Sequence, residues 1–180
     1  MSKDSRVAGS QDFTLGYEPG KGTFRVYVCL GLAAAFGYGW YAFGSEISLL
    51  LAAFFAITGY YFYPLIETGR VRIGAGEHGI FIEGLGVIPW RSIKDIRLNT
   101  YAVRSIEVNE LDIELSHALP KALIADWRSL PYHRLLMKLP WSMTRDGVVR
   151  INLEPFPEAP DDIVNALIRT RKFFGNQVFR

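Results

Sequence analysis

The chain has 180 residues, enough for a pair of membrane-spanning helices and one compact domain but not for a second domain. Its formal net charge of +2 gives no overall field that would favour nucleic acid. Its single cysteine, Cys29, excludes an intramolecular disulfide and a cluster of thiolate metal ligands. The hydrophobic content of 49% is high for a soluble protein, and the excess lies in the first third of the chain. The composition therefore favours a membrane protein.

The first 23 residues are polar, small and rich in glycine, which predicts a flexible tail. A secretory signal would place a short apolar core soon after a basic start. Here the apolar part begins late, continues for longer and is followed at once by a second apolar run. We therefore expect a first helix that is retained rather than cleaved.

Two apolar runs, residues 26–43 and 47–66, are separated only by a short turn that contains Glu46. An α-helix needs about 20 apolar residues to cross the hydrocarbon core of a bilayer. Residues 24–66 are thus predicted to form a transmembrane helical hairpin. The basic residues that flank it, Lys21 and Arg25 before and Arg70 and Arg72 after, place both termini in the cytoplasm.

Small residues recur at every fourth position of the first span, at Gly31, Ala35 and Gly39. Such spacing lets helices approach closely in lipid. We expect this face to pack within the hairpin. The alternative is that it docks another membrane protein.

After residue 66 the periodicity changes from helical to alternating. Apolar positions alternate with polar ones in 70–73, 80–83, 93–98, 106–115 and 148–153, which predicts antiparallel strands. Turns are expected at 74–79, at 84–86 and at Asn109 and Glu110. A closing amphipathic helix is predicted to begin near Pro160 and to end at Gly175.

Residues 117–146 interrupt the strand pattern with prolines, two expected short helices and a mixture of basic and aromatic residues. Three interpretations stay open: the apolar residues cover the domain, or the segment contacts anionic lipid, or it contacts a protein partner. The candidate surface is Arg128, Arg134, Lys138 and Trp141, with juxtamembrane Arg70 and Arg72 and, more weakly, Lys94 and Arg97.

The order of these elements resembles the membrane-anchored pleckstrin-homology-like (PH-like) proteins of bacteria, whose function is uncharacterised. The resemblance depends on Gly79-Ile80-Phe81-Ile82, the turn at 84–86, the stretch 88–96 with Trp90, Ile93 and Ile96, and the closing helix. It implies an α+β membrane protein of the inner membrane. In that fold, a PH-like antiparallel barrel or sandwich at 68–180, closed by a capping helix, follows the hairpin on the cytoplasmic side.

No convergent set of catalytic residues is apparent. Residues 74–79 match G-x-G-x-x-G, but an alternating strand follows where the nucleotide motif needs a helix. The histidines are scattered, and no serine lies in a G-x-S-x-G turn. We therefore expect neither enzyme activity nor a cofactor or metal. The predicted function is a membrane-tethered interaction module for a protein or anionic lipid. The alternative is an accessory subunit that docks through the hairpin.

Overall fold

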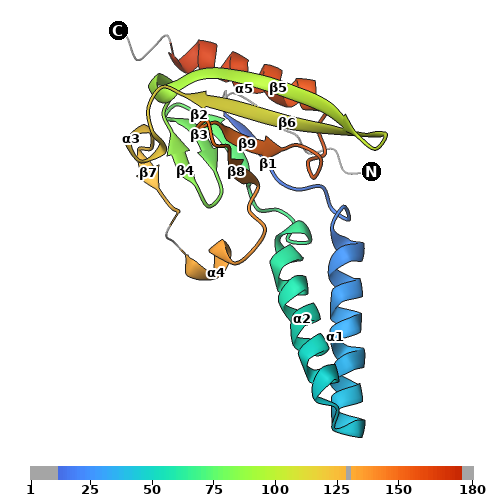
Figure 1. Cartoon of the computed structure of the whole chain (residues 1–180). Coiled ribbons are helices and arrows are strands. Elements are labelled where there is room, and N and C mark those ends of the chain that lie inside the picture. Colours follow the sequence, from blue (N-terminus) through green and yellow to red (C-terminus); the bar gives the residue numbers. More distant parts are fainter. Residues whose placement is uncertain (1–11, 129–130, 176–180) are drawn as a thin grey trace.

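The computed structural model describes residues 12–128 and 131–175 and shows a helical hairpin projecting from an α+β domain (Figure 1). The hairpin consists of α1 (Thr23–Phe43) and α2 (Glu46–Phe62), and the short helix η1 (Tyr63–Leu65) follows it. Gly44 ends α1 in the left-handed conformation at φ 64°, and the Ser45 side chain caps α2 by accepting a hydrogen bond from the Ser48 amide. The predicted hairpin is confirmed as a pair of helices.

Both helices are exposed along most of their length. They are long and apolar enough to cross a membrane, and only 6% and 11% of their apolar windows are buried. A helix from the core of a soluble domain would be mostly buried. The hairpin is therefore not the core of the domain, which lies elsewhere.

The described strands of the domain form two antiparallel sheets. The first has the order β1-β2-β3-β4-β7, made of Phe13–Leu15, Ile73–Gly76, Gly79–Ile82, Gly86–Ile88 and Ala125–Asp126. The second has the order β5-β6-β9-β8, made of Ile93–Val103, Ile106–Leu115, Val149–Asn152 and Trp141–Met143. Because isoleucine, valine and leucine side chains from both sheets share one buried cluster, the sheets enclose a single core.

The closing helix α5 (Pro160–Gly175) crosses the end of the domain opposite to the hairpin (Figure 1). Ile163, Leu167 and Thr170 form its buried stripe, as its periodicity predicts. The remaining helices are single turns: η2 (Trp90–Ser92), α3 (Leu119–Ala122) and α4 (Tyr132–Leu135). Of these, α4 lies at the hairpin end of the domain (Figure 1).

Three expectations need correction. Residues 13–22 are not a flexible tail, because β1 pairs with β2 and Leu15 is 2% exposed; residues 1–11 lie outside the described residues. Asn109 and Glu110 lie inside β6, and the turn falls instead at residues 104–105, both with positive φ. The described strands form two sheets rather than a closed barrel.

The role of β1 predicts a difference between two neighbouring substitutions. Leu15→Ala leaves a cavity in the core and should lower the free energy of unfolding by about 3 kcal/mol. Thr14→Ala, at an exposed position of the same strand, should change it little. Chemical unfolding of the full chain in detergent, followed by tryptophan fluorescence, measures both. Equal stability of the two variants would contradict the place of β1 in the core.

Candidate functional site

The hairpin is inserted between two paired strands. Leu15 at the end of β1 lies opposite Ile73 at the start of β2, and the whole hairpin runs between them. The chain enters and leaves the hairpin at nearly the same point, where a Cβ placed on Gly22 would lie 2.0 Å from the Cβ of Leu65. Only glycine allows this close approach. Both ends of the hairpin therefore join the domain at one place.

On the α1 side, the connection is held by main-chain oxygens of the loop that follows β9. The Glu18 amide donates to the Pro155 carbonyl at 2.9 Å. The Lys21 ammonium donates to the Glu154 carbonyl at 2.9 Å and to that of Phe156 at 3.2 Å. The glycine-rich stretch before α1 is thus fixed to the domain rather than free.

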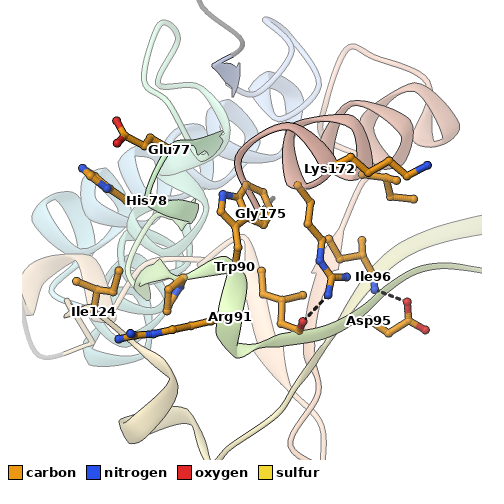
Figure 2. A pocket seen from close by; sticks show the side chains of 13 residues that line it. Glu77, His78, Trp90, Arg91, Asp95, Ile96, Ile124, Lys172 and Gly175 are labelled. Carbon is orange, nitrogen blue, oxygen red and sulfur yellow. Dashed lines mark hydrogen bonds between the residues drawn. The ribbon is translucent and has the colours of Figure 1, made fainter. Parts of the chain in front are cut away.

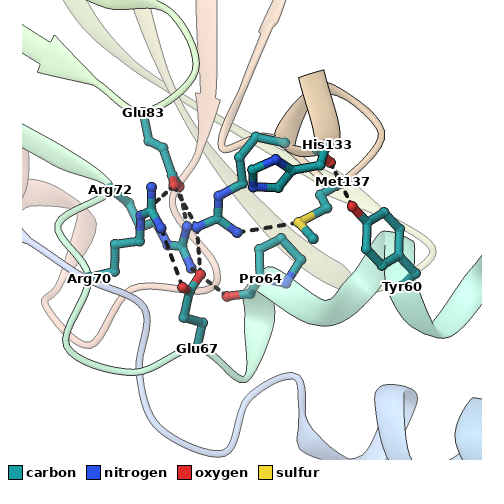
Figure 3. A network of polar contacts seen from close by, with 9 residues as sticks. Tyr60, Pro64, Glu67, Arg70, Arg72, Glu83, His133 and Met137 are labelled. Atoms are coloured by element: carbon teal, nitrogen blue, oxygen red, sulfur yellow. Dashed lines mark hydrogen bonds and ion pairs between the residues drawn. The ribbon is translucent and has the colours of Figure 1, made fainter. Parts of the chain in front are cut away.

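On the α2 side, the connection is held by Arg72, whose side chain is 0% exposed (Figure 3). Its guanidinium forms ion pairs with Glu83 and, at 3.0 Å, with Glu67, and it donates to the Pro64 carbonyl at 2.8 Å. Its Cζ lies over the Tyr17 ring, 4.9 Å from the ring centroid. Arg72 thus joins the segment after η1 to the first sheet.

Two further arginines complete this junction network. Arg134 of α4 pairs with Glu67 at 2.5 Å and with Glu83 at 2.9 Å, and Arg70 pairs with Glu83 at 2.9 Å. Arg134 also contacts the sulfur of Met137 at 3.3 Å. Three arginines therefore share two glutamates, and the network brings together the end of the hairpin, the first sheet and α4. Removing either partner of such a buried pair leaves a charge without compensation.

The environment of the network shifts the pKa values of Tyr17 and Glu67. Burial raises the pKa of Tyr17 to about 12. Burial alone would raise the pKa of Glu67, but the hydrogen bonds from Arg134 and Arg72, together with their charges, lower it overall. Glu67 is therefore a carboxylate throughout the neutral range and stays paired there.

The α4 segment, here residues 132–138, lies directly beside the last turn of α2. The Tyr60 hydroxyl donates to the His133 carbonyl at 3.0 Å (Figure 3), and the Lys138 amide donates to the Tyr61 carbonyl at 2.8 Å. Around these contacts Tyr132 and Leu136 project outward, 75% and 70% exposed. Burial and the positive charge of Arg25 lower the pKa of Lys138. The end of the hairpin that joins the domain is thus next to exposed apolar side chains and to two neighbouring cations, Lys138 and Arg25.

The candidate residues do not form the single surface that the sequence predicts. Arg72 and Arg134 are buried in the network, because each is neutralised there by Glu67 and Glu83; this corrects their expected exposure. Trp141 is half-buried in β8 at the edge of the second sheet. The other candidates remain at least partly accessible to solvent. Arg70 lies beside the network, Lys138 lies in the α4 segment, and Arg128 is paired with Asp126 of β7. Lys94 and Arg97 lie on β5.

The three small residues on one face of α1, Gly31, Ala35 and Gly39, likewise do not share one environment. Gly39 lies near Ser48 of α2, where an added Cβ would be 3.5 Å from the hydroxyl. Gly31 and Ala35 are exposed, and a Cβ added to Gly31 would have no neighbour within 4 Å, which corrects the expectation that this face packs within the hairpin. The helices meet instead through stacked Phe36 and Phe55, at a centroid distance of 5.7 Å.

Sequence reasoning missed the two glutamates and Tyr17. Glu83 directly follows β3, which alternates as expected, so its charge alone predicts a solvated position. Arg70 and Arg72 lie two residues apart and would share one face of an extended segment, so the alternation gives no signal that only Arg72 is buried.

The described residues contain no group of three or more histidine, cysteine, aspartate or glutamate side chains that could hold a metal. Comparisons with family models, curated proteins and solved structures found no match for this chain. The function is therefore argued from the site itself.

The lowered pKa of Glu67 predicts how acid affects the junction. The ionised carboxylate contributes stability above its ordinary pKa of 4.5, and this contribution is lost as the pH falls through the lower folded value. Glu67→Gln should therefore destabilise the chain by about 2 kcal/mol at pH 7. The difference from wild type should shrink below about pH 4.5.

Unfolding of the detergent-solubilised chain between pH 7 and pH 3 measures this difference. Glu77→Gln removes an exposed carboxylate in the turn between β2 and β3 and is the matched control. Parallel stability curves for wild type and Glu67→Gln over the whole range would contradict the pairing of Glu67.

Proposed function

We propose that the protein is a non-catalytic, membrane-anchored interaction module. Its hairpin crosses the cytoplasmic membrane and its α+β domain lies at the cytoplasmic surface. The observation that carries this proposal is the insertion of the hairpin between the paired strands β1 and β2. Because both ends of the hairpin join one domain, they must lie on the same side of a membrane that the hairpin enters.

Several features support the anchor. The exposed length of α1 and α2 suits a bilayer, and Lys21, Arg25 and Arg70 lie at their domain end. A signal sequence cleaved after α1 would remove β1, whose Leu15 is part of the core. These features favour a retained hairpin with both of its ends in the cytoplasm. That the domain is PH-like stays a prediction, which the two sheets and the closing helix α5 support.

We assign the lipid-facing part of the domain to α4. The contacts of His133 and Lys138 with Tyr60 and Tyr61 hold this segment at the level of the last turn of α2, where a spanning helix reaches the headgroups. Exposed Tyr132 and Leu136 are of the kind that enters this interface. Lys138 and Arg25 add charge that anionic lipid attracts.

Depth measurements test this assignment. A nitroxide attached through Leu136→Cys, in a Cys29→Ala chain reconstituted into vesicles with anionic lipid, should be relaxed more by oxygen than by a water-soluble nickel chelate. The reason is that oxygen concentrates in the bilayer. A label attached through Arg169→Cys, exposed on α5, should show the opposite order. Equal access of the nickel chelate to both labels would contradict the contact of α4 with lipid.

A second candidate function is that of an accessory subunit in a larger membrane complex. The observation that favours it is the outward position of Gly31 and Ala35, which leaves a flat strip on α1 free to receive another helix. In this case the hairpin, rather than the domain, makes the contact with the partner.

Purification from native membranes in mild detergent tests this second candidate. Gly31→Leu combined with Ala35→Leu should abolish the recovery of a stoichiometric membrane partner, because the added side chains separate the helices. Leu50→Ala, at an exposed position of α2, should leave recovery unchanged. A wild-type chain that purifies alone, or a partner that remains bound to the double variant, would exclude this function.

A further inference from the structure

A cleft of about 790 Å³ opens on the domain beside the last turns of α5 (Figure 2). Its walls come from α5, from the η2 turn with the start of β5, and from the turn between β2 and β3. Since α5 crosses the end of the domain opposite to the hairpin, the cleft lies away from the membrane that the hairpin is proposed to enter (Figure 1). A lipid of that bilayer therefore does not reach it.

The floor of the cleft is apolar and rigid. Trp90 is buried there, and its indole N–H is already used by the Gly76 carbonyl at 2.9 Å. Ile93 and Ile96 are buried beside it, while Ile168 of α5 is partly exposed. These side chains offer no unsatisfied hydrogen-bonding group to a ligand. A bound group that reaches the floor must therefore be apolar as well.

The rim of the cleft is mainly basic. Arg91 and Lys172 are exposed and have no ion pair among the residues that the structure describes. Arg171 donates to the Ile93 carbonyl at 2.7 Å and to the Lys94 carbonyl at 3.3 Å, so it is positioned by main-chain oxygens. Because these contacts use only part of its five donors, the guanidinium can still bind a carboxylate.

Two carboxylates also line the cleft, but they do not cancel the cations. Asp95 is paired with Arg97 at 2.5 Å and accepts from the Ile96 amide at 2.8 Å. Glu77 lies across the cleft on the β2–β3 turn, away from α5 (Figure 2). The side formed by η2 and α5 therefore keeps an excess of positive charge.

We propose that this cleft binds an acidic peptide segment of a partner protein, with an apolar side chain on the floor and carboxylates at Arg91, Arg171 and Lys172. An extended peptide matches cations that are spaced along an open rim, and its apolar residue supplies the buried contact. The inference rests on the proposed function, since it names the partner class that a membrane-anchored module would recruit.

Selection of peptides tests the proposal directly. A phage-displayed library of random twelve-residue peptides is panned against the full chain in nanodiscs with a neutral lipid. The enriched peptides are expected to contain leucine, isoleucine, phenylalanine or tryptophan flanked by aspartate or glutamate. Their affinity should fall as the salt concentration rises, because the rim charges are exposed to solvent.

Charge reversal then locates the site. Arg91→Glu combined with Lys172→Glu should weaken a selected peptide about tenfold, while Arg104→Glu, exposed in the turn between β5 and β6, should leave the affinity unchanged. Ile168→Glu should abolish binding by placing a carboxylate at the floor. Loss of peptide binding leaves the lipid contact of the Leu136 label unaffected, so the failure of one proposal is distinguishable from that of the other.

Two results would overturn the proposal. The first is a selection that enriches no peptide, or peptides without the acidic and apolar pattern. The second is binding that the cleft variants do not change.

Discussion

The buried pairing of Arg72 with Glu83 and Glu67 is the interaction on which the rest of the structure depends. A guanidinium without solvent exposure is unfavourable unless carboxylates and hydrogen bonds compensate its desolvation. Here the compensation comes from the end of β3, from the segment after η1 and from the Pro64 carbonyl. The same glutamates hold Arg134, so the position of α4 is fixed by the same charges. The hairpin, the first sheet and α4 are therefore held together as one unit by the same set of ion pairs.

This unit gives the domain two ends with different chemistry. At the hairpin end, Tyr132 and Leu136 present apolar surface beside cations. At the opposite end, the cleft beside α5 combines an apolar floor with a basic rim. Because the junction has two covalent connections and a buried network, the domain cannot rotate freely about its anchor. A ligand at the cleft would thus be held at a constant distance and orientation from the hairpin.

The elements with a continuous periodic pattern could be predicted from the sequence. The apolar runs of α1 and α2, the alternation of β9 and the amphipathic stripe of α5 each repeat often enough to identify the element. The strand β1 has only three residues, so no period is visible, and its pairing depends on β2 far along the chain. The burial of Arg134 depends on Glu67 and Glu83, which precede it by 67 and 51 residues. The sequence alone does not indicate that these two glutamates are the partners of Arg134.

The insertion of the hairpin between β1 and β2 has a consequence for how the chain folds. Pairing Leu15 with Ile73 closes a long loop, and the entropy of that closure opposes folding. When α1 and α2 pack together, they bring Gly22 and Leu65 into contact and remove most of that cost beforehand. If the hairpin enters a bilayer as proposed, its helices meet there and hold the ends of β1 and β2 close together before these strands pair. The proposed membrane anchor would then also lower the entropic cost of forming the first sheet.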